Sequence, residues 1–503
     1  MELFVNCNTS TLAPYTTPLD ALRARHLYRR LGFSASVETV NQAVGQSATA
    51  LVDNLVDQAL AIPPIPAPAW SEWTNANYPE DDDLARQVRR AQREELNTAY
   101  GNGLLNNNLL DRMSFFWSNH FVTELDVYDC NSFLYEYVNC LQRNALGNFK
   151  TFVSEIGLTS AMLRYLDGAF NNRNRPNENY SRELYELFTL GEGNAYTEED
   201  IIETSRALTG YVNRGDVGCT KITFNPEQFD TDPKTILGQT GNWGYDDVMN
   251  ILFDNRADSI ARFICTKFYE FFVHPDSKRD EYNPGATYPP GHPQGIINEL
   301  AQTFVANNFE IAPVLRQMFK SEHFFDETTI GVIIKSPFDL YLNLFKETGF
   351  AYNDGNVTNA MDASAMIGQE LWDPVDVAGW QRDREWINTN FIIGRWLTAE
   401  VFLEQFFQAD PNQFRALGIA AAGPNGATIN DPNIVARAII DKFLPKGLLT
   451  DADYDIAISV FREPYEDTNM FETGSWNMLL DDTPSQVFLL LLHLVREPEF
   501  QLK

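Results

Sequence analysis

The sequence is poor in basic residues for its size. Lys and Arg number 38 against 69 Asp and Glu, which gives a formal net charge of −31. A surface this acidic repels phosphate backbones and anionic lipid head groups, so we expect neither nucleic acid nor a membrane surface as a partner. Long apolar runs are missing as well. None approaches the roughly 20 residues that a helix needs to cross a bilayer, and we expect no membrane span.

Cysteine is also scarce, with five residues scattered along 503. They are Cys7, Cys130, Cys140, Cys219 and Cys265. No CxxC pair occurs, which argues against a zinc knuckle, and the odd count and wide spacing argue against a dense disulfide framework. The sequence therefore predicts buried free thiols. The first twenty residues carry neither a basic stretch nor an apolar stretch, so no secretory signal peptide is visible in them.

Apolar residues make up 44% of the chain and aromatic residues 13%, enough for a sizeable core. Helical periodicity dominates, and we predict a mainly α fold, a large bundle-like body with a small β-hairpin or loop insertion near 212–244. The whole chain, 1–503, is predicted to be one domain. Its predicted sub-regions are N-terminal helices 1–61, a Pro-rich connector 62–80, central helices 81–211, a β/loop insertion 212–257 and a C-terminal helical part 258–503.

Several familiar catalytic and binding signatures are absent. The sequence has no GxGxxG, no P-loop, no HExxH and no GxSxG, so none of the enzyme classes that these motifs mark is indicated. The acidic run 451–455 resembles the start of a calcium loop, but Ile456 and Arg462 stand where such a loop needs Gly and Glu. We therefore exclude an EF-hand.

The predicted helix 109–121 carries the first candidate, His120. At 100° per residue His120 falls on the same apolar face as Met113 and Trp117, which predicts a buried side chain. A buried histidine must satisfy both ring nitrogens. A core histidine bonded to a carbonyl or carboxylate is the simplest interpretation, and a metal ligand is the alternative.

The segment 177–193 carries the second candidate, Glu183. It lies on the shoulder of an apolar stripe that includes Leu187, where a carboxyl has a raised pKa unless it meets a cation or a donor. Arg182 and Glu186 are four residues apart and can pair on the surface. Further on, Arg206 lies near the end of another predicted helix, within reach of a buried carboxylate.

Six segments, taken together, resemble one family. They are ARHLYRRLGF (24–33), FFWSNHF (115–121), NENYSRELYELFTLG with TGY (177–211), KTILG (234–238), KSP (335–337) and MIGQELWDPVDVAGW with WIN (366–388). In this order, over nearly the whole chain, they resemble the bacterial family catalogued as domain of unknown function 1800. The resemblance implies an exported protein, periplasmic or extracellular, that is often encoded beside sulfatase-like or alkaline-phosphatase-like proteins. Those proteins are candidate partners, and self-association is another possibility.

The resemblance also points to individual residues. The family's recurring polar or aromatic positions fall on Asn119, His120, Asn177, Glu178, Asn179, Arg182, Glu183, Glu186, Arg206 and Trp380. The chain departs from the family once: where members tend to carry a His-Asp pair ahead of the KTILG-like segment, this sequence has Phe229-Asp230. If that histidine is catalytic or a ligand, this chain is an impaired or structural relative.

Two functional hypotheses follow. The first is a hydrolytic or oxidative enzyme acting on extracellular polymer, with a site between the His120 and Glu183 helices. His120 would be a ligand or base, Glu183 a ligand or general acid with Glu186 beside it, and Arg206 an anion clamp. His120 and Glu183 would hold a divalent or transition metal ion, and 372–380 would line the cleft. The second is a non-catalytic extracellular structural or assembly protein with an acidic surface and a buried polar network that fixes helix packing.

Overall fold

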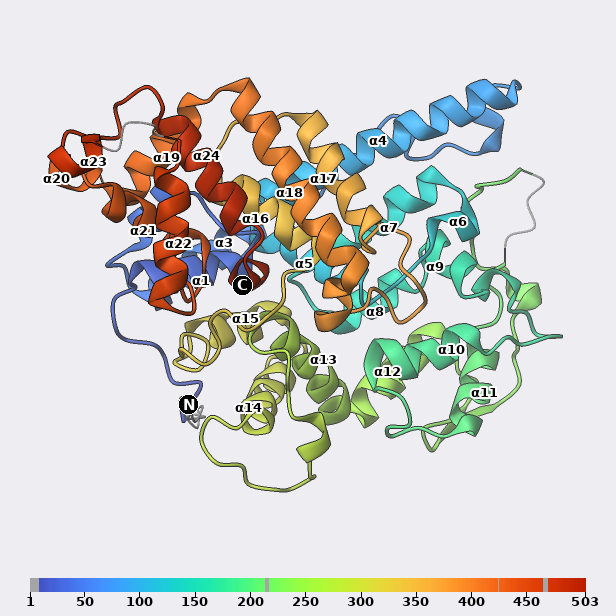
Figure 1. Ribbon diagram of the computed structural model, residues 1–503. Helices are drawn as coiled ribbons and strands as arrows, with labels where there is room; N and C mark the ends of the chain where they lie inside the picture. The colour runs from blue at the N-terminus through green and yellow to red at the C-terminus, as the bar shows by residue number, and fades with distance from the viewer. Residues whose placement is uncertain (1–8, 213–216, 424, 465–468) are drawn as a thin grey trace.

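The computed structural model describes residues 9–212, 217–423, 425–464 and 469–503. These residues form 24 α-helices and one two-stranded antiparallel hairpin, so the predicted mainly α class is confirmed (Figure 1). The division of the chain into one domain stays a prediction, although one apolar core cluster includes residues from Leu12 to Phe500.

The chain begins with short helices separated by capping residues. They are α1 (Ala21–Leu31), α2 (Val37–Ala43) and α3 (Ala48–Ala61). An extended connector follows and leads to α4 (Asp82–Asn106), whose N-cap Asp81 accepts a hydrogen bond from the backbone N–H of Leu84. In Figure 1, α4 reaches out from one side of the molecule.

The central part of the chain is built of shorter helices. They are α5 (Leu109–Ser118), α6 (Leu125–Tyr128), α7 (Asn131–Asn144), α8 (Phe149–Ile156), α9 (Ser160–Tyr165), α10 (Asn179–Glu183) and α11 (Glu198–Ala207). The helix α10 continues directly into a π-helical turn, Leu184–Thr189. The candidate His120 lies just beyond the end of α5, because that helix stops at Ser118 and not at residue 121.

The expected β-hairpin lies within 212–244 and consists of β1 (Lys234–Ile236) and β2 (Gln239–Gly241). Leu237 and Gly238, both with positive φ, make its two-residue turn, the geometry that suits a tight hairpin. The rest of the expected insertion needs a correction. Residues 245–255 are helical, as α12 (Tyr245–Asn255), whose start Asp247 caps by accepting from the backbone N–H of Gly244.

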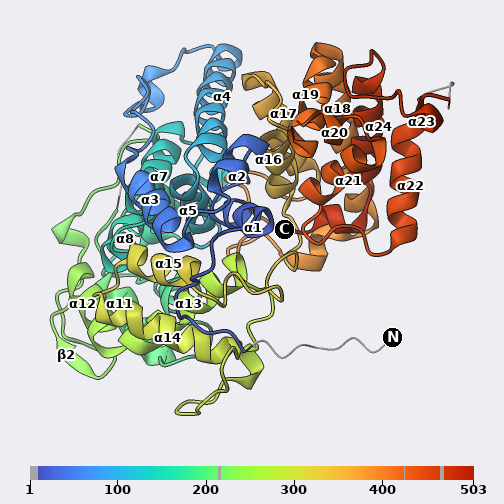
Figure 2. The same cartoon turned by 90° about the vertical axis from the view of Figure 1, so that its left-hand side faces the viewer.

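The remaining helices complete the body. They are α13 (Ala257–Phe272), α14 (Pro293–Ala306), α15 (Ile311–Lys320), α16 (Pro337–Thr348), α17 (Asp354–Met366), α18 (Thr389–Ala409), α19 (Asn412–Ala422), α20 (Gly426–Ile429), α21 (Pro432–Phe443), α22 (Asp451–Arg462), α23 (Asn469–Thr473) and α24 (Thr483–Leu494). Helices α19 to α24 gather at one end of the molecule (Figure 1). The turned view shows α1 close to the last residues of the chain (Figure 2), where Arg30 donates to the backbone oxygen of Lys503.

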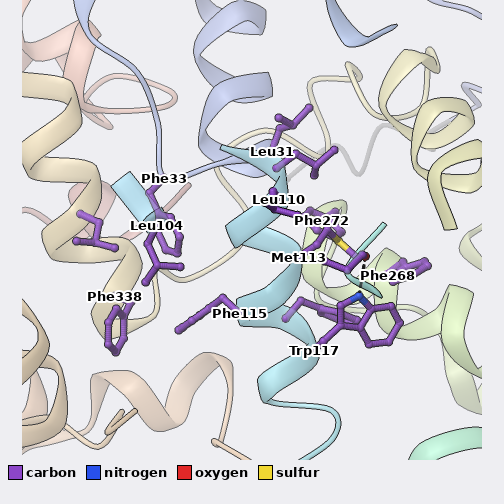
Figure 3. Close-up of a cluster of buried hydrophobic side chains, with 14 of the residues drawn as sticks. Leu31, Phe33, Leu104, Leu110, Met113, Phe115, Trp117, Phe268, Phe272 and Phe338 are labelled. Atoms are coloured by element: carbon purple, nitrogen blue, oxygen red, sulfur yellow. Dashed lines mark hydrogen bonds between the residues drawn. The ribbon is translucent and has the colours of Figure 1, made fainter. Parts of the chain in front are cut away.

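Helix α5 runs through the middle of the apolar core, and all of its residues are buried. Figure 3 shows Met113 and Trp117 on one side, near Phe268 and Phe272 of α13, and Phe115 on the other, near Phe338 of α16. Because α5 is covered on every side, any polar group at its end must find its partners inside the protein.

The prediction of free thiols is wrong for two cysteines. Cys130, which precedes α7, and Cys219, in the loop after α11, form a disulfide. The fold brings these residues together across 89 positions of sequence, a proximity that spacing alone does not reveal. Cys140 and Cys265 are free and buried, as predicted, and Cys7 lies outside the described residues.

None of the helices in the described ranges combines the length and the apolar character that a membrane-crossing segment requires.

Candidate functional site

His120 lies in a shell of aromatic rings and is 3% exposed, so the predicted burial is confirmed. The rings around it belong to Phe116, Trp117, Phe121, Phe149, Phe188 and Phe263. Its Nε2 is 3.0 Å from the backbone oxygen of Phe188, and its Nδ1 is 3.0 Å from the Nζ of Lys267. A neutral imidazole has one donor and one acceptor, so Nε2–H donates to Phe188 and Nδ1 accepts from Lys267. Burial, and then the charge of Lys267, hold the pKa of His120 well below its usual value.

The π-helical turn 184–189 supplies the carbonyl groups of this site. The last carbonyls of a helix have no partner within it, and they are free to bind side chains. Phe188 uses its carbonyl for His120, and Leu187 accepts from Lys267 at 3.3 Å. π-Helical turns recur at functional sites. Here the turn binds two side chains, His120 from just beyond the end of α5 and Lys267 from α13.

Lys267, on α13, is the group that sequence analysis missed. Burial, followed by the charges of Arg382 and Arg279, lowers the pKa of its amine to about 7 against the opposing effect of Glu270. In the sequence, Lys267 stands in an ordinary helical pattern, so only its fold-dependent contact with His120 identifies it.

Glu183 is not brought to His120. Its carboxyl is half-buried, and burial, followed by repulsion from Glu186, raises its pKa against the effect of Arg182. No hydrogen bond or ion pair to this carboxyl is found within the described part of the chain. The raised pKa matches the expectation for a carboxyl on the edge of an apolar face.

The neighbours of Glu183 form a surface cluster around Arg182. Its guanidinium lies 3.2 Å from Glu186, 3.4 Å from Glu178 and 2.8 Å from Glu198. The expected pairing of Arg182 with Glu186 is therefore present, within a larger cluster of three acids. Arg182 is engaged at the surface and does not neutralise Glu183 by direct contact.

Asn177 and Asn179 shape the backbone that leads into α10. The Asn177 side chain accepts from the backbone N–H of Asn179 at 2.9 Å, and the Asn179 side chain donates to Asp167 at 2.8 Å. Both are local turn contacts of a kind that asparagine commonly makes.

Arg206 is held by two acids. Its Nε is 2.8 Å from Asp230 and its Nη1 is 2.7 Å from Glu203, and both carboxylates are largely buried. Phe229, where the resembled family tends to carry histidine, packs its ring 5.7 Å from that of Phe224 and 4.9 Å from the amine of Lys234. Phe229 therefore makes apolar and cation–π contacts at this position.

Asn119 and Trp380 join two of the motif segments. The backbone N–H of Trp380 donates to the Asn119 side-chain oxygen at 2.6 Å, and the Trp380 ring stacks on Phe115 at 5.2 Å. The preceding Gly379 has φ +95°, and a Cβ there would lie 2.3 Å from that same Asn119 oxygen. Only glycine fits this contact without a shift of the backbone.

A cavity of about 70 Å³ lies beneath Trp380. Its aromatic lining is Phe115, Phe271, Trp380 and Trp386, and its charged lining is Glu270, Asp339, Arg382, Asp383 and Lys503. Of the predicted site residues, Asn119 and Trp380 line it. Glu270 lies on α13 and Asp339 on α16, whereas Arg382 and Asp383 lie in the segment before α18 and Lys503 is the last residue of the sequence. The Ser336–Asp339 capping box was the one local signal that could have drawn attention to Asp339.

A larger cleft, of about 730 Å³, runs along the exposed face of α7. Its lining includes Glu136, Arg143, Glu155 and Lys221 but none of the predicted site residues. Within the ranges that the structure describes, no group of three or more His, Cys, Asp and Glu side chains is placed to hold a metal ion. The structure thus does not bring the predicted candidates together: His120, Arg182 and Arg206 have separate partners, Asn119 binds Trp380, and Glu183 stands apart.

A protein-family model described as "Protein of unknown function (DUF1800)" matches residues 26–502, nearly the whole chain. No curated protein and no solved structure matches it. The match takes in every motif segment that carried the resemblance apart from the first two residues of 24–33. This protein belongs to the DUF1800 family.

Proposed function

We propose that this chain is an exported, non-catalytic structural or assembly protein, and that its family motifs build a buried polar network that fixes helix packing. One observation carries the proposal. Both ring nitrogens of His120 are bonded within the protein, to Phe188 and Lys267, inside a shell of aromatic rings. A general base or a metal ligand needs a ring nitrogen that faces substrate, water or metal.

The other candidates support the same interpretation. Arg206 is bound by Asp230 and Glu203, so it has no free edge with which to clamp a substrate anion. Asn119 holds the loop that ends in Trp380. Buried networks whose members are all bonded define one packing arrangement, because every alternative arrangement leaves a polar group without a partner.

Export is supported by the disulfide between Cys130 and Cys219. Disulfides persist in the periplasm and outside the cell, whereas cytosolic thiols are kept reduced. The net charge of −31 suits an acidic surface that maintains solubility or contacts cations. Sulfatase-like or phosphatase-like proteins, and self-association, remain the expected classes of partner.

A double-mutant cycle between His120 and Lys267, with elemental analysis of the purified chain, tests the proposal. We expect His120→Phe and Lys267→Met each to lower the free energy of unfolding, because each leaves the other side chain of the pair buried without its partner. The double variant removes both side chains, so its loss should be smaller than the sum of the two single losses. His493→Asn, at a partly exposed histidine, is the control. A stoichiometric transition metal that is lost in His120→Phe would overturn the proposal.

One observation favours the enzymatic alternative, a hydrolytic or oxidative enzyme acting on extracellular polymer. Glu183 has a half-buried carboxyl with a raised pKa, a property of general acids. In this alternative Glu183 donates the proton as general acid, and the neighbouring Glu186 raises the pKa of Glu183. A divalent or transition metal is part of this alternative only if Nδ1 of His120 gives up its hydrogen bond from Lys267. The test is release of reducing ends from soluble polysaccharides: Glu183→Gln should abolish it while Glu178→Gln, on the same surface, retains it. Equal activity in both variants would exclude Glu183.

A further inference from the structure

Helix α18 is apolar on two opposite faces. One face, which includes Phe402 and Phe406, is buried in the core. The opposite face carries the α18 stripe, formed by Ile393, Leu397 and Val401 at a spacing of four residues, and these side chains are 46%, 55% and 46% exposed. A helix that is apolar all round is normally buried, so the α18 stripe indicates a surface that another molecule covers.

The sides of the α18 stripe carry little charge. On one side lies α17 (Figure 1), where Met366 is 73% exposed and extends the stripe, because the next residue, Ile367, lies against Gly394 of α18. On the other side Glu400 is paired with Arg496, so this side has no net charge. The stripe is therefore bordered by an apolar side chain and by a neutral ion pair.

The net charge of −31 limits which surfaces two copies of the chain can bring together. Copies repel one another wherever both present acids, so they approach closely only at a surface that has few of them. A two-fold axis through Leu397 sets Ile393 of each copy against Val401 of the other. The ridge of residues four apart packs against an identical ridge at a crossing angle of about −50°, the commonest angle between packed helices.

The charges along α18 favour an antiparallel contact between the two copies. Glu404 is exposed and continues the α18 stripe toward the C-terminal end of the helix. The other end of α18 carries the partial positive charge of a helix N-terminus and follows the exposed Arg384. An antiparallel contact brings Glu404 of each copy to the N-terminal turn of the other, near Asn390, whereas a parallel contact sets the two Glu404 carboxylates against each other.

We propose that a second copy of this chain covers the α18 stripe, in a two-fold antiparallel contact of the two α18 helices centred on Leu397. The biological purpose of this contact rests on the assembly role proposed above. A contact between two short stripes buries a small area, so the dimer should be weak, with a Kd of about 1–100 µM. Salt should strengthen it, because salt screens the repulsion between two acidic chains.

Sedimentation equilibrium of the full chain, at concentrations that span the expected Kd and in low and high salt, tests the proposal. We expect a monomer–dimer equilibrium that shifts toward the dimer in high salt. A monomer under every condition would overturn the proposal and leave the α18 stripe to a partner of another kind. A dimer that dissociates in high salt would also overturn it, because charge and not apolar contact would then hold the copies together.

Three variants assign the contact to the α18 stripe. Leu397→Asp sets two like charges against each other at the two-fold axis and should raise the Kd of the dimer by about tenfold or more. Ile456→Asp, at a residue of α22 that is 54% exposed, is the matched control and should leave the Kd unchanged. Glu404→Gln should weaken the dimer, whereas a stronger dimer would mean that the helices pack in parallel. Equal Kd values for Leu397→Asp, Ile456→Asp and the wild type would refute the proposed surface.

Failure of this contact and failure of the proposed function are distinguishable. A monomeric wild type would leave the coupling between His120 and Lys267 as it is, since neither side chain belongs to α18. A transition metal that is lost in His120→Phe would overturn the assembly role without changing the mass of the particle.

Discussion

Trp380 and Asn119, 261 residues apart in the sequence, are joined by a hydrogen bond of 2.6 Å from the backbone N–H of Trp380 to the side-chain oxygen of Asn119. Trp380 Nε1 donates in turn to the backbone oxygen of Glu370 at 3.0 Å. Two motifs of the family therefore meet at the end of α5, and the contact fixes the loop that covers the 70 Å³ cavity.

Gly379→Ala should break this junction. The new methyl group would lie 2.3 Å from Asn119 Oδ1 at a residue with φ +95°, so backbone strain and steric overlap act together. We expect a loss of about 2–4 kcal/mol in the free energy of unfolding, measured in urea. Gly426→Ala, at a helical glycine with no heavy atom within 4 Å of the added Cβ, is the control and should be neutral or slightly stabilising. An unchanged Gly379→Ala would show that the loop is not held there.

The buried pair Arg29–Glu347 joins α1 to α16. The guanidinium donates to both carboxylate oxygens, at 2.6 and 3.1 Å, and each side chain is 2% exposed. Glu347→Gln leaves Arg29 buried without its acid and should cost about 3–5 kcal/mol in urea unfolding. The double variant Arg29→Met, Glu347→Leu should cost less than the sum of the single changes. A cost as small as that of Asp83→Asn, in an exposed pair with Arg86, would contradict this prediction.

Much of the fold was predictable because it depends on local pattern. Helical periodicity gave the mainly α class and the burial of His120, whose apolar face is set by spacing along one helix. The i to i+4 spacing of Arg182 and Glu186 gave their ion pair. The hairpin was expected within a Gly-rich segment, although α12 begins earlier than the predicted end of the insertion.

The partners of these residues were not predictable, because they come from distant parts of the chain. Lys267 meets His120 across 147 positions and Lys503 meets Asp339 across 164. Nothing in the pattern around either lysine distinguishes it from a surface residue. The pairing of Cys130 with Cys219 was missed for the same reason, since five scattered cysteines allow many pairings and the spacing favours none.

Lys267 should make stability rise with pH above neutrality. Its pKa in the folded protein is about 7, below the ordinary value of 10.5, so between these values the unfolded chain holds a proton that the folded chain lacks. The free energy of unfolding therefore increases with pH in this range. In Lys267→Met, the slope of the free energy of unfolding against pH between pH 7 and 10 should fall by an amount that corresponds to the release of up to one proton. Lys278→Met, at a surface lysine beside Asp276, should leave the slope unchanged.

An unchanged slope in Lys267→Met would mean that Lys267 stays protonated in the folded protein. Its charged amine would then still donate to His120 Nδ1 and to the backbone oxygen of Leu187. Lys335 and Lys442, whose pKa values burial also lowers to about 7, would be the source of any remaining slope.

Replacing Cys130 and Cys219 by Ser together should lower the free energy of unfolding by about 3–5 kcal/mol, because the disulfide closes a loop across 89 positions and restricts the unfolded chain. Reduction of the wild type should cause the same loss and have no further effect on the double variant. Maleimide labelling of the chain, unfolded without reductant, should detect two thiols fewer than labelling after reduction. Equal labelling would mean that the two cysteines are reduced in the protein as isolated. The proposal of export would then lose its structural support, because this disulfide is the one feature of the described structure that indicates an oxidising compartment.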